Sequence, residues 1–63
     1  MTLYITGKLV CCIGWDVQIW DDGEGLYGVE VDGDGNPVGV FPLNEVNRDW
    51  VEPHLPKGVE FPE

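Results

Sequence analysis

The chain contains neither alanine nor serine, and its 63 residues include a single histidine, His54. Alanine is the strongest helix former, so its absence weighs against long helices. Hydrolytic and transfer enzymes usually need a nucleophile held beside a base, or a loop that binds phosphate. The sequence offers no such arrangement, so we expect a protein that is not an enzyme and needs no cofactor.

Positive charge is also scarce, because Lys8, Arg48 and Lys57 face twelve acidic residues and leave a net charge of −9. A surface of one sign repels phosphate backbones, so direct binding of nucleic acid is not expected. The same surface attracts a basic partner, or it only keeps a small domain soluble and monomeric. Between Lys8 and Arg48 there is no basic residue, and the acids there are Asp16, Asp21, Asp22, Glu24, Glu30, Asp32, Asp34 and Glu45.

The two cysteines, Cys11 and Cys12, are adjacent, so a disulfide between them would close a strained ring and is not expected. Free thiols fit a reducing compartment. No long apolar run is present and Lys8 is the first basic residue, so we expect neither a signal peptide nor a transmembrane helix. The predicted location is the cytoplasm, of a cell or of a virus-infected cell, away from membranes.

Metal binding is not expected from either candidate pattern in the chain. Neighbouring residues of a strand point to opposite faces, so Cys11 and Cys12 cannot both ligate one zinc ion with His54. Residues 32–36 carry the first three ligand types of an EF-hand loop, but Pro37 stands where that loop needs glycine. We interpret residues 32–36 as the turn of a hairpin.

Short alternating and apolar runs between glycines, prolines and aspartates predict strands. In residues 39–46, Pro42 should end one strand and Val46 should lie in the closing one, with Val51 also in the core. Gly28 should let another strand or a ligand come close. The predicted strands are 1–6, 8–13, 15–20, 26–31, a hairpin partner ending at 41, and 44–51.

The last part of the chain has a different composition, with Pro53, Pro56 and Pro62 close together. We predict an extended tail over residues 53–63, partly polyproline II and partly ordered by its few apolar residues, after a domain over residues 1–52. Its Pro-x-x-P pattern is followed by Lys57, as in ligands of peptide-binding grooves.

Residues 39–46, Gly-Val-Phe-Pro-Leu-Asn-Glu-Val, resemble the G-x-F-P-x-N-Y-V segment of Src-homology-3 domains, with Glu45 in place of its tyrosine. Asp21-Asp22-Gly23 and the hairpin also lie roughly where that family has its acidic loop and distal hairpin. The resemblance implies an all-β fold, a small five- to six-stranded SH3-like barrel, and a groove for proline-rich peptides with a basic flank. The residues that it implies for the groove are Tyr4, Tyr27, Pro42, Asp21, Asp22 and Glu24.

Seven aromatic residues are many for so small a core, and surface tyrosine and tryptophan often anchor protein partners. Our first hypothesis is a module that binds a basic or proline-rich protein. The alternatives are an acidic inhibitor or decoy, of a kind that phages encode, for the basic site of a nucleic-acid enzyme, and a structural subunit. The tryptophans could instead only cap the barrel. The candidate binding residues are Tyr4, Trp20, Asp21, Asp22, Glu24, Tyr27, Pro42 and Trp50.

Overall fold

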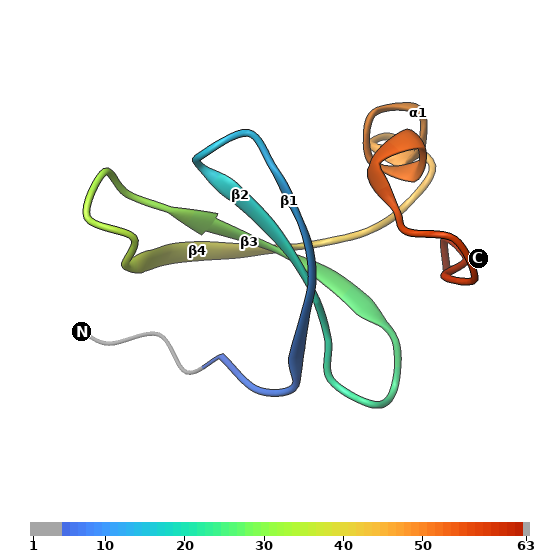
Figure 1. Ribbon diagram of the computed structural model, residues 1–63, viewed down its shortest axis with the longest axis horizontal. Helices are drawn as coiled ribbons and strands as arrows, with labels where there is room; N and C mark the ends of the chain where they lie inside the picture. Colours follow the sequence, from blue (N-terminus) through green and yellow to red (C-terminus); the bar gives the residue numbers. More distant parts are fainter. Residues whose placement is uncertain (1–4, 63) are drawn as a thin grey trace.

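Four antiparallel strands form one open sheet in the computed structural model, which describes residues 5–62 (Figure 1). The strands follow one another in the sheet in chain order, so each pair is a hairpin. The predicted strands at 8–13 and 26–31 and the hairpin that follows them are confirmed. The elements are β1 (Lys8–Ile13), β2 (Val17–Asp21), β3 (Leu26–Val31), β4 (Pro37–Pro42), the helix α1 (Arg48–Val51) and the 3₁₀ helix η1 (Glu52–His54).

The β2–β3 and β3–β4 turns are held by aspartate side chains that accept backbone N–H groups. In the β3–β4 turn, Asp32 Oδ1 accepts hydrogen bonds from the N–H groups of Asp34 and Asn36, both at 2.9 Å. Such bonds replace the ladder where the chain reverses. The β1–β2 turn includes Trp15 and Asp16, so β2 begins at Val17 and not at the predicted Trp15.

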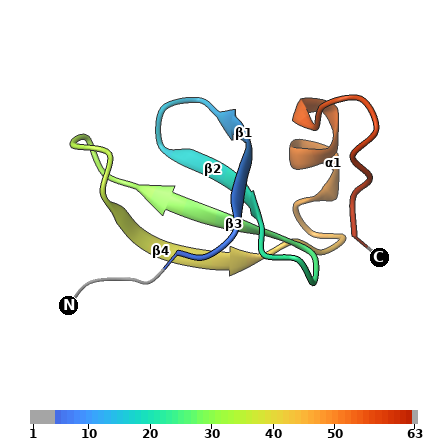
Figure 2. The same ribbon diagram turned by 60° about the horizontal axis from the view of Figure 1, so that its bottom comes forward.

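One face of the sheet carries the main core. Ile13, Val17 and Ile19 point to this face and pack with Val51 and Phe61, which follow the sheet in sequence. Figure 2 shows α1 and the C-terminal segment side by side beyond one end of the sheet. The buried set therefore joins residues from both ends of the chain, and we call this side the core face.

Gly28 allows a close contact on the core face. A Cβ atom at this position would overlap the ring of Phe41, its cross-strand partner. The Phe41 ring stacks in turn on Trp50 of α1, with centroids 6.2 Å apart and an interplanar angle of 25°. The missing side chain at Gly28 does allow a close approach, but the group that approaches is an aromatic side chain that connects the sheet to the helix, and not the predicted strand or ligand.

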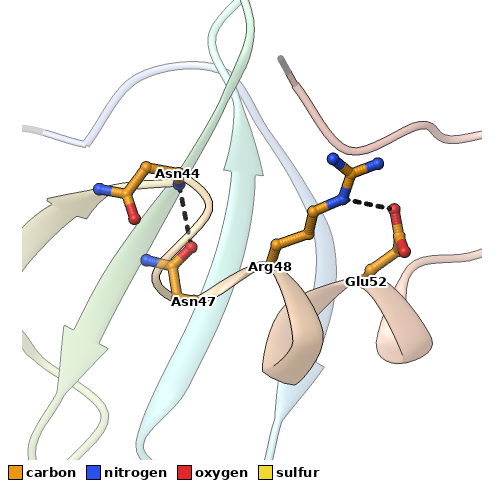
Figure 3. A network of polar contacts seen from close by, with 4 residues as sticks. All are labelled: Asn44, Asn47, Arg48 and Glu52. Atoms are coloured by element: carbon orange, nitrogen blue, oxygen red, sulfur yellow. Dashed lines mark hydrogen bonds and ion pairs between the residues drawn. The ribbon is translucent and has the colours of Figure 1, made fainter.

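The predicted last strand, residues 44–51, is wrong, because this segment forms a turn and then α1. Asn47 Oδ1 accepts the N–H of Asn44 at 3.0 Å (Figure 3). Asn47 Nδ2 donates to the carbonyl of Pro42 at 3.0 Å. Asparagine side chains that bond nearby backbone favour turns over strands. Val51 is in the core at 0% exposure as predicted, whereas Val46 is 91% exposed and the prediction for it is wrong.

Removing the Asn47 side chain should loosen this corner. Asn47→Ala deletes both hydrogen bonds, and we expect it to lower the free energy of unfolding by about 1–2 kcal/mol. Asn47→Asp is the matched control, because it keeps the acceptor for Asn44 and loses only the donor to Pro42. Urea unfolding would measure both variants. An unchanged midpoint for Asn47→Ala would show that the corner does not depend on these bonds.

The described residues form an all-β sheet with a short helix, and their four strands do not close into the predicted five- to six-stranded barrel. Ile5 and Thr6 are not in a strand, and residues 1–4 of the predicted first strand lie outside the described range. Pro53 and His54 are in η1, so the predicted extended conformation is wrong there; proline suits the first turn of a helix. Over residues 5–62, no helix is long and apolar enough to span a membrane.

Candidate functional site

Side chains from all four strands line up on the face opposite the core. Pairing places Leu9 beside Trp20, Trp20 beside Tyr27, and Tyr27 beside Pro42. Residues paired directly across a sheet share a face, and Ile19, one residue before Trp20, points to the core. We call these four residues the aromatic row.

The aromatic row is an apolar strip that is partly open to solvent. Leu9 is 48% exposed, Pro42 is exposed, and the two aromatic rings are half-buried. Val40 extends the strip along β4, and it is 56% exposed. Trp20 Nε1 donates to Gln18 Oε1 at 2.9 Å, which satisfies the indole N–H and helps to fix the ring. The strip can therefore take an apolar ligand without leaving that N–H unpaired.

The β2–β3 turn places carboxylates beside the middle of this strip, next to Trp20 and Tyr27. Asp21 follows Trp20 directly, and its Oδ1 accepts the N–H of Gly23 at 2.8 Å. Asp22 Oδ1 accepts the N–H groups of Glu24 and Gly25 at 2.8 and 3.1 Å. The carboxylate of Glu24 forms no hydrogen bond or ion pair with another described residue. We call residues 21–25 the acidic turn; two of its acids shape the loop and the third is available to a partner.

Hollows flank the acidic turn on both sides. One, of about 370 Å³, lies between the turn and the start of β1 and is lined by Gly7, Lys8 and the two aspartates. The other, of about 560 Å³, lies between the turn and the C-terminal segment, where Glu60 adds a further acid. Both hollows are open to solvent and bordered by carboxylates, which suits the long cationic side chains of a basic partner.

The predicted binding residues do not all meet at this place. Trp20, Tyr27 and Pro42 lie together in the aromatic row, next to the acidic turn, but Asp21 pairs with Leu26 and its side chain therefore lies on the core face. Trp50 lies on the other face against Phe41, and Tyr4 is outside the described residues. Sequence reasoning missed Leu9 and Val40. Val40 is two residues before Pro42 in the same strand, so alternation would have placed it on the same face. Leu9 lies in a continuous apolar run, in which alternation does not show which face a residue is on.

The remaining chemically reactive side chains do not assemble into a site in the described part of the chain. Cys11 is half-buried and Cys12 is exposed; burial, and then the neighbouring Cys12, raise the pKa of the Cys11 thiol. That thiol stays protonated and packs against the core as an apolar group. Among residues 5–62, no three histidine, cysteine, aspartate or glutamate side chains are placed to hold a metal ion.

A further hollow, of about 470 Å³, lies beside α1 and is lined by Leu43, Arg48 and Phe61 among others. Arg48 Nε donates to Glu52 at 3.3 Å (Figure 3), and its guanidinium carbon lies 5.7 Å from the centroid of the Phe61 ring. The Arg48–Phe61 contact joins the C-terminal segment to the helix. We therefore interpret this arginine as a packing residue.

Known proteins do not identify this chain. Comparisons with protein-family models, curated proteins and solved structures find no match. The function has to be inferred from the arrangement of the aromatic row and the acidic turn, and from the charge of the chain as a whole.

Proposed function

We propose that the protein is a non-enzymatic binding module that docks a proline-containing segment of a partner protein on the aromatic row. The observation that carries the proposal is the strand pairing that sets Trp20, Tyr27 and Pro42 side by side, next to the acidic turn. The SH3-like relationship and a cytoplasmic location belong to the same proposal.

The chemistry of the surface indicates the kind of ligand. Proline rings pack well on aromatic faces, and a polyproline II segment loses little entropy when it docks. The acidic turn and a net charge of −9 attract lysine and arginine in the flank of that segment. The proposed ligand is therefore a Pro-x-x-P segment followed by basic residues.

Trp20→Ala should weaken binding of such a ligand about tenfold or more, because large aromatic anchors dominate small interfaces. The probe is a synthetic Pro-x-x-P peptide ending in two arginines, titrated by NMR. Trp15→Ala is the matched control, since Trp15 is an exposed tryptophan in the β1–β2 turn, outside the aromatic row. Equal affinities for both variants and the parent, with all three folded, would contradict the proposal.

A second candidate, an acidic inhibitor or decoy for a basic site, is favoured by the single-signed charge between Lys8 and Arg48. Surface charges are screened over about 10 Å at 0.1 M salt, so a decoy would release its target early in a salt gradient. A peptide held by the aromatic row would be retained longer. Glu24→Lys would weaken the complex with the peptide. Asp34→Lys is the matched control, because it makes the same charge change in the β3–β4 turn, away from the acidic turn. A stoichiometric complex that resists both salt and these substitutions would indicate a structural subunit.

A further inference from the structure

The chain before β1 forms a hydrogen-bonded contact with the aromatic row. The hydroxyl of Tyr27 donates to the carbonyl oxygen of Thr6 at 2.7 Å, and it accepts the N–H of Thr6 at 3.3 Å. Both backbone groups of one residue are thus bound by one side chain, across 21 residues of sequence. Thr6 itself is exposed, so water can compete for both bonds.

Gly7 is the residue that lets the chain reach this position. Its φ is +101°, in the region that favours glycine, and a Cβ atom would overlap the carbonyl oxygen of Asp21 and lie 2.7 Å from Asp22 Cα. The backbone at Gly7 therefore lies directly against the acidic turn. Any side chain there would push residues 5–7 away from the turn and from Tyr27.

We propose that residues 5–7 form a strap that occupies part of the aromatic row in the free protein and has to leave when a peptide docks. This inference rests on the proposed function. The Tyr27 hydroxyl is the hydrogen-bonding group in the centre of the row, and a docked peptide backbone would use it as Thr6 does. One hydroxyl cannot bind Thr6 and the peptide at the same time. The apparent affinity for the peptide is therefore the affinity of the open form multiplied by the fraction of molecules in which the strap is open.

The size of the effect follows from the bonds that close the strap. Two neutral, solvent-exposed hydrogen bonds give a modest net stabilisation, so a peptide should bind about three- to tenfold more tightly once they are removed. A ligand that has to displace the strap also binds after an opening step. The N-terminal segment would then set the affinity of the site without contributing to the core.

The test uses Gly7→Ala, whose Cβ would overlap the backbone at Asp21 and should displace the strap, and which substitutes no residue of the row. Gly35→Ala is the matched control: φ at Gly35 is +84°, so the backbone strain is similar, but nothing lies within 4 Å of its Cβ position and it is in the β3–β4 turn. Tyr27→Phe is a second variant: it keeps the ring but removes the bonds to Thr6 and the bond to the peptide together, so it should open the strap without tightening binding. Each protein is titrated by NMR with the Pro-x-x-P peptide ending in two arginines, and exchange of the Thr6 amide reports the strap.

Tighter binding by Gly7→Ala than by the parent and Gly35→Ala, with faster Thr6 exchange in Gly7→Ala and Tyr27→Phe and no gain in affinity for Tyr27→Phe, would support the strap. The same holds if only Gly7→Ala binds. Binding by the parent with no gain in Gly7→Ala would overturn the strap and leave the proposed function standing. If no folded variant binds the peptide, the proposed function fails and the strap fails with it as a regulator of that site.

Discussion

Replacing Phe61 with alanine should lower the free energy of unfolding by about 3–5 kcal/mol, the usual result of deleting a buried aromatic ring. Phe61 is 8% exposed and packs with Ile19 and Val51 at the centre of the core. Stability of about 0.05–0.15 kcal/mol per residue gives a chain of 63 residues only about 3–9 kcal/mol in total. Much of the Phe61→Ala protein should therefore be unfolded at room temperature, which circular dichroism and urea unfolding would show.

Two controls make this result specific to the core position. Val46→Ala also removes apolar atoms, but Val46 is 91% exposed and the substitution should change stability by less than about 0.5 kcal/mol. Phe61→Leu keeps most of the buried volume and should lose less than Phe61→Ala. A Phe61→Ala protein as stable as the parent would mean that the C-terminal segment only rests on the sheet. The expected loss would make that segment part of the folding unit.

The strands and turns could be predicted from the sequence because their signals are local. Tyr27, Val29 and Val31 at alternate positions indicated β3, and the run Asp32–Gly35 with Asn36 indicated the turn after it. Aspartate bonds its own backbone two residues on, so the signal and its cause lie in the same few residues. The hairpin was predictable for the same reason.

The corner after β4 could not be predicted in this way. Val46 and Val51 favour a strand by type, whereas the side chain of Asn47, which bonds Asn44 and the carbonyl of Pro42, favours the turn that is observed. Two local preferences compete there, and residue type alone does not rank them. The burial of Phe61 depends on contacts distant in sequence, which no local pattern contains.

In the candidate site, too, local features could be predicted from the sequence and the position of a distant segment could not. The surface location of Trp20 and the acids after it followed from alternation and turn composition, and Trp50 was grouped with them because it is also a surface aromatic. The structure separates them, since Trp50 stacks on Phe41 on the core face. Trp50 lies on the core face because it belongs to α1 and not to the predicted strand. The wrong prediction for this one element therefore assigned one candidate binding residue to the wrong face.

Gly28→Ala should destabilise the protein by about 1–3 kcal/mol, although one methyl group is added and the backbone is ordinary strand. The new Cβ would overlap the ring of Phe41, and that ring cannot move back freely because Trp50 stacks on it. The stiffer unfolded chain would offset only about 0.4–1 kcal/mol of the loss. Urea unfolding measures the stability, and the near-ultraviolet circular dichroism of Trp50 should change with it.

Gly39→Ala is the matched control, because Gly39 is a strand glycine two residues before Phe41 and its Cβ would meet only the flexible tip of Glu30, at 3.1 Å from Oε2. Its stability should change little. In a Phe41→Leu background the overlap at Gly28 is relieved, so Gly28→Ala should cost less there than in the parent, a coupling between residues in contact. Equal costs in both backgrounds would mean that the ring does not fill the space over Gly28. The expected coupling would show that a missing side chain in β3 positions the aromatic pair that connects the sheet to α1.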